Sequence, residues 1–428
     1  MQTANPWRWI PTLYFGQGLP YVVVMTLAVV MYKNLGVGNT EIALYTSWLY
    51  LPWVIKPLWA PLVDLLGSKR RWVVALQFGI GVAFACVALT LPGPAWLQMS
   101  LAMFWLMAFA SATHDIAADG FYMLALPQRS QAAFVGVRST FYRLSMIGGQ
   151  GGLVYLAGWL HERSGSFVQA WMLVFWALCG AFLLAAVYHL WALPRPASDR
   201  PVSRSASFSS DFYAVYRAFF KQAGIGRILA FLLLYRFAEA QLLKLVTPFM
   251  LDPRSAGGLG LKTQEVGIAY GTVGVAALTV GGLLGGWLIS RRGLKNMLWP
   301  LVLCMHLPNA VYIALAAWQP GSLWAVAAAI ATEQFGYGLG FTVYMVFMLM
   351  VAGGPDGNAV QKPAHCAAHY ALCTGFMALG MMLPGMAAGW LQERLGYTGF
   401  FVWVCVATLP SFAAAALVRI EPGFGRKR

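Results

Sequence analysis

Long apolar stretches recur along the whole chain and are separated by short polar segments. A helix that crosses a bilayer needs roughly 20 mostly apolar residues, and these stretches reach that length. They lack the alternation in segments of about ten residues that is typical of a membrane β-barrel. The pattern predicts an all-α membrane protein with twelve spans, at residues 9–32, 40–65, 72–92, 97–125, 131–160, 167–193, 225–250, 264–290, 295–317, 322–352, 363–391 and 397–419.

Similar segments occur at corresponding places in the two halves of the chain. "LAGWLHERSG" at 156–165 ends the fifth span, and "AAGWLQERLG" at 387–396 ends the eleventh. "PLVDLLGSKRR" at 61–71 follows the second span, and "LISRRGLKN" at 288–296 follows the eighth. Because the matched spans have the same orientation, they predict two parallel six-helix repeats, as in the major facilitator fold.

The composition changes strongly only between Pro194 and Gly224. This segment begins rich in Pro, Ser and Arg, and from Ser210 it shows the spacing of an amphipathic helix that lies in the membrane interface. We therefore expect an N-terminal six-helix half at 1–193, a cytoplasmic linker at 194–224, a C-terminal six-helix half at 225–419 and a basic tail at 420–428.

The distribution of charge gives the orientation. The formal net charge is +15, although charged residues are only 10% of the chain. Nineteen Lys and Arg lie in the loops and tails of one side, and five lie on the other, namely Lys33, Arg163, Arg254, Lys262 and Arg394. This asymmetry places both termini in the cytoplasm and accounts for the basic excess without nucleic acid. Met1 to Trp7 lacks the basic start of a signal peptide, so none is expected.

The fourth predicted span carries two carboxylates and an imidazole. Asp115 and Asp119 are four residues apart and share one helix face, and His114 lies on an adjacent face. Spans four and five are antiparallel. Counted from their turn, Asp119 and Arg138 lie about nine residues away, and Asp115 and Arg143 about fourteen. The two Asp–Arg pairs can therefore meet at similar depths.

Two interpretations of these groups stay open. The pairs either hold the N-terminal half together, or one carboxylate titrates during transport, so that Asp115, Asp119 and His114 form a proton-coupling site. Ionisable residues inside a membrane are costly and usually have partners or face a watery cavity. Lys56 of the second span lies at comparable depth and is an alternative partner for Asp119.

Other polar residues near mid-depth are expected to line one central cavity and bind a substrate, although each alone suits an interhelical contact equally well. They are Tyr14, Gln17, Tyr21, Lys56, Arg138, Arg143, Arg236, Glu239, Glu333, Gln334 and Tyr337. A cluster of Gly16, Gly18 and Pro20 predicts a bend in the first span. The spacing puts Arg236 within pairing distance of Glu239, whereas Lys244 can reach the outer interface by snorkelling.

Several other chemistries are not supported. "HCAAHY" contains His365, Cys366 and His369, but no carboxylate follows, so no metal is expected. There is no phosphate-binding loop of the ATPase type, and no cofactor is expected. All six cysteines fall within the predicted spans, which gives no disulfide framework.

Three stretches resemble one family. "SATHDIAADGFYMLAL" at 111–126, "YRLSMIGGQGGLVYLAG" at 142–158 and "KPLWAPLVD" at 56–64 are similar to the AmpG-like muropeptide permeases of the major facilitator superfamily. Relatives in that group are linked to siderophore uptake and acetyl-CoA transport. The resemblance implies proton-driven import of anhydro-muropeptides across the bacterial inner membrane.

The resemblance also implies roles for particular residues. Asp115 and Asp119 stand where the family has paired aspartates, and Tyr142 with Arg143 matches its Tyr-Arg pair, which implies substrate binding. The segment after the second span keeps three residues of the superfamily's cytoplasmic gating motif, namely Asp64, Gly67 and Arg70. The chain departs from the usual pattern at four positions, with Ala60 for Gly, Leu65 for a basic residue, His114 for Gln and Tyr122 for a basic residue.

The sequence thus predicts a proton-coupled symporter for a small polar solute, acting as a monomer in the lipid bilayer. A siderophore or CoA-ester permease of the same fold is one alternative. A membrane receptor or assembly protein on a transporter-like scaffold is another, although the long soluble domain that would favour it is not seen in the sequence. An intramembrane hydrolase is disfavoured, because no nucleophile has a suitable spacing from His114 and Asp115.

Overall fold

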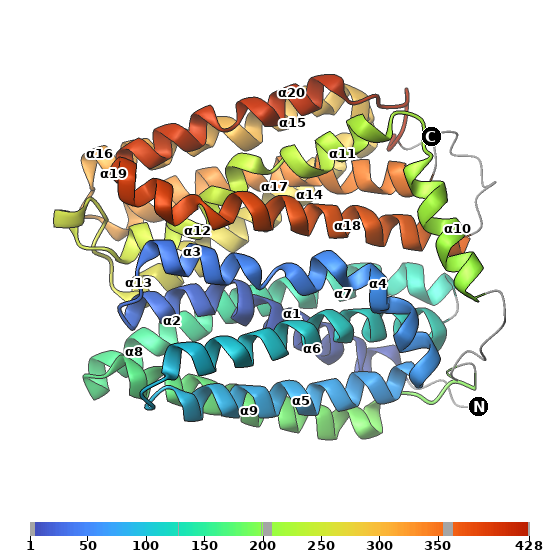
Figure 1. Ribbon diagram of the computed structural model, residues 1–428, viewed down its shortest axis with the longest axis horizontal. Coiled ribbons are helices and arrows are strands. Elements are labelled where there is room, and N and C mark those ends of the chain that lie inside the picture. Colours follow the sequence, from blue (N-terminus) through green and yellow to red (C-terminus); the bar gives the residue numbers. More distant parts are fainter. Residues whose placement is uncertain (1–4, 127, 198, 200–207, 354–362, 427–428) are drawn as a thin grey trace. The chain divides into compact units, whose positions relative to one another are not determined.

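The computed structural model describes residues 5–126, 128–197, 199, 208–353 and 363–426, and all regular elements in these ranges are helical (Figure 1). The chain forms two compact units. The N-terminal unit contains 1–36 and 58–204, and the C-terminal unit contains 37–57 and 205–428. The boundary runs through helix α4 (Leu51–Leu66), so that most of the second predicted span belongs to the C-terminal unit.

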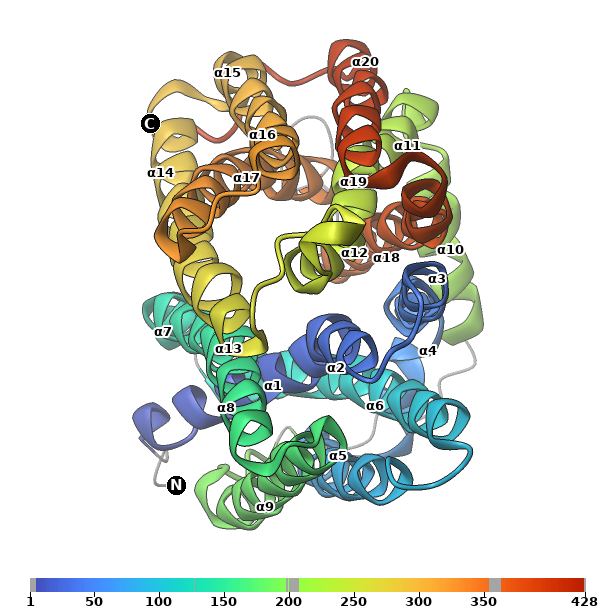
Figure 2. The same ribbon diagram turned by 90° about the vertical axis from the view of Figure 1, so that its left-hand side faces the viewer.

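The N-terminal unit is a bundle of long helices. Its elements are η1 (Pro6–Arg8), α1 (Ile10–Val22), η2 (Val23–Leu27), α2 (Ala28–Asn34), α5 (Lys69–Thr90), α6 (Trp96–Ala125), α7 (Gln128–Ile147), η3 (Gly148–Leu153), α8 (Val154–Ser164) and α9 (Phe167–Ala192). Helix α5 packs against α6 and α9, while α1 packs against α6 and α7. The end-on view in Figure 2 shows these helices side by side.

The C-terminal unit has more elements and the same bundle character. They are α3 (Asn39–Trp48), α10 (Phe208–Phe220), α11 (Ile225–Leu234), α12 (Phe237–Leu251), η4 (Arg254–Ala256), α13 (Thr263–Val266), η5 (Gly267–Gly274), α14 (Val275–Arg292), α15 (Leu294–His306), η6 (Leu307–Asn309), α16 (Ala310–Trp318), α17 (Leu323–Gly353), α18 (Pro363–Met386), α19 (Ala388–Val406) and α20 (Leu409–Leu417). Helix α17 packs against α14 and α15, while α12 packs against α18 and α19. Helix α3 lies against α18 and α19 (Figure 1).

Among the residues that the structure describes, eight helical stretches are long and apolar enough to cross a membrane. They are Pro6–Asn34, Lys69–Thr90, Trp96–Ala125, Phe167–Ala192, Thr263–Arg292, Leu294–Trp318, Leu323–Gly353 and Ala388–Leu417. The other four predicted spans coincide with helices that are shorter, broken or richer in polar residues, namely α3–α4, α7–α8, α11–α12 and α18. The number twelve therefore stays a prediction, while the all-helical membrane fold agrees with the sequence.

The first span is irregular where the sequence predicts a bend. Pro20 lies inside α1, and a π-helical segment, η2, follows it. A methyl group at Gly18 would collide with the Ser145 hydroxyl of α7. Glycine thus permits the close approach of α1 to α7, and this approach positions the polar residues of α1 beside those of α6 and α7.

The repeated segments adopt matching local structures. Arg163 lies over the ring of Trp159 at 3.9 Å from its centroid, and in the second repeat Arg394 lies over Trp390 at 5.0 Å. Each segment ends at a glycine with positive φ, Gly165 (69°) and Gly396 (68°). The ψ angles differ, at 6° and 174°, but glycine adopts a positive φ at little cost in both places, which explains why both repeats have it.

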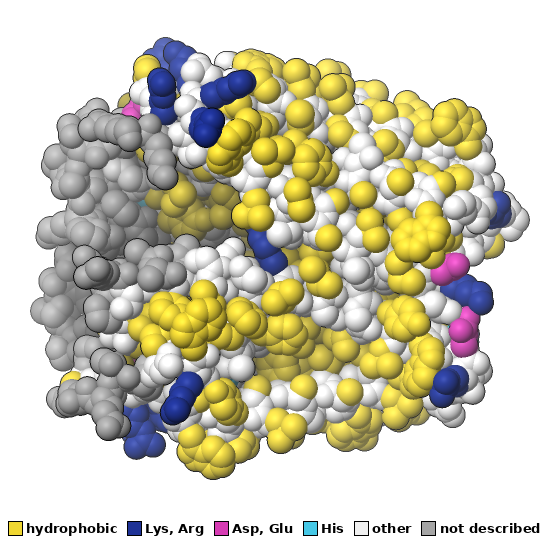
Figure 3. Space-filling view, turned by 180° about the vertical axis from the view of Figure 1, so that it is seen from behind, with side chains coloured by type: hydrophobic (Ala, Val, Ile, Leu, Met, Phe, Trp, Pro, Cys, Tyr) yellow, Lys and Arg dark blue, Asp and Glu magenta, His cyan; other side chains and the backbone are white. Residues whose placement is uncertain are grey.

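Large apolar side chains remain exposed on helices of both units. Trp191 and Trp318 are 80% and 81% exposed, and Leu184 is 72% exposed. Figure 3 shows hydrophobic side chains over much of the visible face. Exposed apolar area of this extent suits contact with lipid. The predicted amphipathic helix is present as α10, and its Phe219 is buried against Phe376.

Candidate functional site

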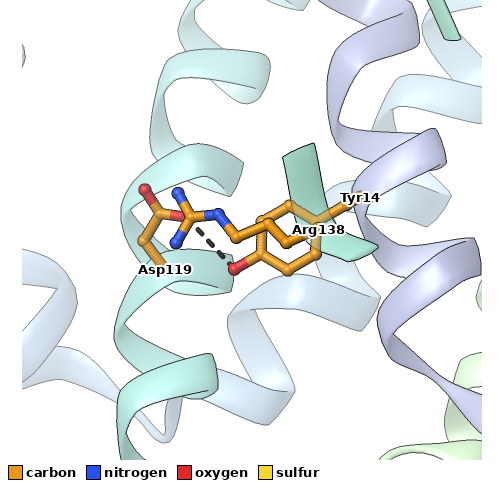
Figure 4. Close-up of polar contacts among 3 residues, drawn as sticks. All are labelled: Tyr14, Asp119 and Arg138. Atoms are coloured by element: carbon orange, nitrogen blue, oxygen red, sulfur yellow. Dashed lines mark hydrogen bonds and ion pairs between the residues drawn. The ribbon is translucent and has the colours of Figure 1, made fainter. Parts of the chain in front are cut away.

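Asp119 and Arg138 form the ion pair that their positions on a helical hairpin predict. A guanidinium nitrogen of Arg138 on α7 lies 2.9 Å from Oδ1 of Asp119 on α6 (Figure 4). The hydroxyl of Tyr14 on α1 donates to the same carboxylate oxygen at 3.3 Å. Three helices thus contribute to one polar cluster. The Asp119 and Arg138 side chains are 37% and 35% exposed, so the pair is accessible to a solute or to water.

Aromatic rings hold the guanidinium in place. The Arg138 guanidinium carbon lies 4.6 Å from the ring centroid of Tyr14 and 5.5 Å from that of Tyr122. These two rings meet edge to face, with centroids 5.9 Å apart. Arginine is attracted to the face of an aromatic ring, so Tyr122 supports the ion pair from the same helix as Asp119. We refer to Tyr14, Asp119, Tyr122 and Arg138 as the N-terminal polar cluster.

The remaining predicted residues of this unit lie on the same helices as the cluster. Asp115 is one turn before Asp119 on α6, and Arg143 follows Arg138 on α7; both are half-buried. Their predicted pairing stays a prediction. Tyr21 and Tyr142 are half-buried, on α1 and α7. Gln17 is buried, and its Oε1 accepts no hydrogen bond within the described part of the chain.

His114 belongs to a buried chain of hydrogen bonds. Nε2 of His114 lies 3.2 Å from Nε2 of Gln77. The other amide atom of Gln77, Oε1, lies 2.8 Å from Nδ1 of His189. Nε2 of His189 in turn lies 2.9 Å from the hydroxyl of Thr12. Gln77, His114 and His189 are each at most 1% exposed. The chain joins α1, α5, α6 and α9, and sequence analysis missed it because these residues come from four separate helices.

The predicted gating segment makes contacts within the N-terminal unit. The Arg70 guanidinium donates to the carbonyl of Leu193 at 3.3 Å and also to that of Leu190, at the end of α9. The Asp199 carboxylate accepts from the backbone N–H groups of Lys69 (2.6 Å) and Arg70 (3.0 Å). Asp199 therefore caps the start of α5. Sequence analysis missed this role.

Two other residues of the gating motif add little to this picture. Gly67 lies beside the indole of Trp72, because a methyl group placed on it would be 3.3 Å from Nε1. The side chain of Asp64 lies outside the described part of the structure.

The C-terminal unit buries two glutamates. Oε2 of Glu333 on α17 accepts hydrogen bonds from the Tyr312 hydroxyl (3.0 Å) and from Nε2 of Gln334 (2.9 Å). Oε1 of Glu333 and both carboxylate oxygens of Glu239 on α12 accept none from the described residues. Both glutamates are 0% exposed. Buried polar groups normally have partners, so these oxygens are unusual.

Arg236 does not pair with Glu239 as its spacing predicts. The helix is interrupted at Tyr235 and Arg236, and Arg236 is the N-cap residue of α12 with a non-helical conformation. Its guanidinium donates to the hydroxyl of Tyr337 and lies 5.0 Å from the ring centroid of Phe341. The break in the helix moves Arg236 out of helical register with Glu239, which a continuous span would have kept.

Lys244 is buried, contrary to the snorkelling expected from its position. It is 4% exposed, and its Nζ donates to the hydroxyl of Thr46 on α3 at 2.9 Å. It also lies 5.1 Å from the ring centroid of Tyr50. Lys244 therefore fastens α12 to α3 within the C-terminal unit. Lys56 is half-buried on the part of α4 that belongs to the same unit.

Only one side chain of the motif His365, Cys366 and His369 lies in the described part of the structure. The side chains of His365 and Cys366 lie outside the described part, while His369 is buried beside Phe219 with ring centroids 5.4 Å apart. Among the described residues, no three His, Cys, Asp or Glu side chains are grouped as a metal would require.

Comparisons with known proteins agree with this architecture. The sequence pattern of the Major Facilitator Superfamily matches residues 12–361. The chain is 27% identical over 419 residues to the anhydromuropeptide permease of Escherichia coli strain K12, covering 95% of this chain and 78% of that protein.

Solved structures show the same fold. The nucleoside transporter NupG superposes with a TM-score of 0.67 at 16% identity, covering 98% of this chain and 100% of the other. A D-xylose–proton symporter gives 0.65 at 13% identity, covering 97% and 96%. The chain therefore belongs to the Major Facilitator Superfamily, as a multi-pass membrane transporter related to the AmpG-like permeases and not as an enzyme.

Proposed function

We propose that this transporter is a proton-coupled symporter that imports a polar solute of the anhydro-muropeptide class across the bacterial inner membrane. The observation that carries the proposal is the Asp119–Arg138 ion pair, which is partly exposed and held by Tyr14 and Tyr122. The similarity to an anhydromuropeptide permease supports the substrate class. Both termini would then lie in the cytoplasm, as the charge asymmetry predicts.

Proton coupling follows from the competition for one carboxylate. Ionised Asp119 is stabilised by Arg138, whereas protonated Asp119 releases Arg138 to bind an anionic group of the substrate. A ligand shifts a conformational equilibrium only through its different affinity for the two states. Proton and substrate would act on the same pair and so favour the same cavity orientation. Asp115 and His114 would tune this step from neighbouring positions on α6.

Substrate recognition would use cationic side chains for the carboxylates of a muropeptide and neutral polar side chains for its hydroxyl and amide groups. Arg143 and Arg138 suit carboxylates of the peptide part, because arginine binds carboxylates with paired hydrogen bonds. Tyr21, Tyr142 and Gln17 suit hydroxyl and amide groups. In the C-terminal unit, Lys56, Arg236, Gln334 and Tyr337 are the corresponding candidates, and Asp64, Gly67 and Arg70 would belong to the cytoplasmic gate.

Transport by purified protein in proteoliposomes tests the proposal. With labelled anhydro-muropeptide outside and an inwardly directed proton gradient, the wild type should accumulate the solute, and an uncoupler should abolish accumulation. Asp119→Asn should fail to accumulate substrate but should still exchange labelled for unlabelled substrate. Glu393→Gln, the isosteric change at an exposed acid, is the matched control. Accumulation by Asp119→Asn with an unchanged pH dependence would exclude Asp119 from coupling.

A ligand screen tests the substrate class separately. Binding to the folded state raises the unfolding temperature in proportion to the logarithm of ligand concentration over its dissociation constant. We expect a thermal shift with anhydro-muropeptides and none with siderophores or CoA esters at the same concentrations. A thermal shift with only siderophores or only CoA esters would reassign the substrate class. Proton coupling would then be tested by the transport assay with that substrate. Light scattering of the detergent complex should give the mass of a monomer.

A further inference from the structure

The two buried glutamates of the C-terminal unit lack the partners that ionised carboxylates need. Glu239 and Glu333 are both 0% exposed. Three of their four carboxylate oxygens accept no hydrogen bond from a described residue. A carboxylate removed from water without partners is strongly destabilised and is usually neutralised by a proton.

The charges around the pair do not balance if both acids are ionised. Glu239 interacts electrostatically with Glu333 and with Arg236. Arg236 is buried, with 8% of its surface exposed, and it donates to Tyr337, whose ring it also contacts. This group therefore contains two carboxyl groups and one guanidinium, which interacts with Glu239. A single proton would make this group electrically neutral.

Other titratable groups nearby do not supply the missing charge. Lys244, on the same helix as Glu239, is directed to Thr46 and Tyr50. Tyr270 and Tyr312 interact electrostatically with Glu333, and the hydroxyl of Tyr312 donates a hydrogen bond to Oε2.

The buried histidines on neighbouring helices are engaged elsewhere. The ring of His306 on α15 packs against Tyr235 and Phe412. His369 on α18 packs against Phe219 and lies 3.4 Å from the amide of Gln222. Neither contact brings a cationic imidazole to Glu239 or Glu333.

We propose that Glu239 and Glu333 form a proton-binding site in the C-terminal unit, in which the two carboxyl groups together hold one proton. The proton would supply the hydrogen-bond donor that the unpaired oxygens lack. Two interacting acids of this kind titrate as a pair, so the proton belongs to both residues. The site is separate from the Asp119–Arg138 pair and extends the proposed function, because it would bind a second proton per transporter.

Infrared spectroscopy of the wild-type protein in liposomes tests this site without any substrate. A protonated carboxyl gives a C=O stretching band that shifts in heavy water, and ionised carboxylates lack it. At neutral pH we expect a band equivalent to one buried carboxyl, and it should disappear on titration to alkaline pH. Absence of any such band in the wild type would overturn the proposal, whatever the behaviour of the variants.

Two isosteric variants assign the band. Glu239→Gln and Glu333→Gln should each remove it, because each replaces one of the two carboxyl groups that hold the proton, and the single remaining carboxylate then balances the charge of Arg236. Glu393→Gln, at an exposed position, should leave it unchanged. A band that persists in both single variants would overturn the shared proton. A band that appears only after sodium is replaced by choline would show a cation site instead and would also overturn it. None of these outcomes depends on transport, so they are separable from failure of symport.

Discussion

The ion pair between Asp119 and Arg138 permits a quantitative test, because both its distance and its exposure are defined. The charged atoms are 2.9 Å apart, and about a third of each side chain is exposed. Two unit charges about 4 Å apart interact by ~4 kcal/mol at an effective dielectric constant near 20. Exposed pairs are worth ~0.2–1 kcal/mol, and breaking a fully buried pair costs ~3–5 kcal/mol. We therefore expect a coupling energy of ~1–2 kcal/mol for this intermediate case.

The single substitutions should differ in size. Arg138→Gln removes the charge and also the contacts of the guanidinium with Tyr14 and Tyr122, each worth ~0.5–1 kcal/mol. Asp119→Asn keeps an oxygen that can accept from Tyr14. Arg138→Gln should therefore be more destabilising by ~1–2 kcal/mol. The loss of unfolding free energy in the double variant should be smaller than the sum of the losses in the two single variants, and the difference is the coupling energy.

Unfolding in mixed micelles, by increasing the fraction of a denaturing detergent, measures the four free energies of this cycle. A second cycle that combines Asp119→Asn with Arg163→Gln is the control, because Arg163 is exposed and contacts Trp159 instead. Distant pairs add within ~0.3–0.5 kcal/mol. If the Asp119–Arg138 coupling is no larger than that of the control cycle, the pair does not stabilise the protein, and the reasoning is refuted.

Three further outcomes are expected from packing, capping and topology. Gly281→Ala should lower stability by ~1–3 kcal/mol in thermal unfolding, because a methyl group there collides with a backbone carbonyl of α17. Gly286→Ala on the same helix, where the nearest atom is 3.9 Å away, should be neutral or slightly stabilising, and equal effects would contradict the packing argument. Asp199→Ala should cost ~1 kcal/mol, because the N–H groups of Lys69 and Arg70 lose their acceptor while Ser68 still caps Arg71, and an unchanged unfolding temperature would contradict that role. Ser164→Cys should react with an impermeant maleimide from outside the cell and Lys221→Cys should not; reversed labelling would overturn the orientation.

Local geometry explains which contacts the sequence could predict. Asp119 and Arg138 lie at equal distances from one turn, and two helices joined by a short turn are antiparallel neighbours, so their pairing follows from counting. Tyr122 lies one turn after Asp119, and the helical period places it on the same face. Trp159 and Arg163 likewise meet because they are four residues apart.

Contacts between distant helices could not be predicted in this way. The position of Tyr14 beside Asp119 depends on how α1 packs on α6 and α7, which periodicity does not determine. The chain from Thr12 to His114 has the same origin. The position of Lys244 in its span predicts that it reaches the interface, and no local pattern reveals its partner Thr46, which lies on α3 almost 200 positions away in the sequence. The break at Tyr235 was missed because the apolar pattern continues through it.

The two acidic sites differ in their access to water, and this difference limits what each can do. The Asp119 side chain is 37% exposed, whereas Glu239 and Glu333 are 0% exposed. A partly exposed carboxylate can exchange its proton while the helices stay in place. A fully enclosed one exchanges only when packed helices separate, and collective motions of this kind take microseconds to milliseconds. Proton binding at Asp119 can therefore follow the arrival of substrate, whereas a proton held by Glu239 and Glu333 can be released only as part of a conformational step. If both sites bind protons as proposed, Asp119 is the one that can load from solution at rest, and the buried pair is the one that keeps its proton until the helices move.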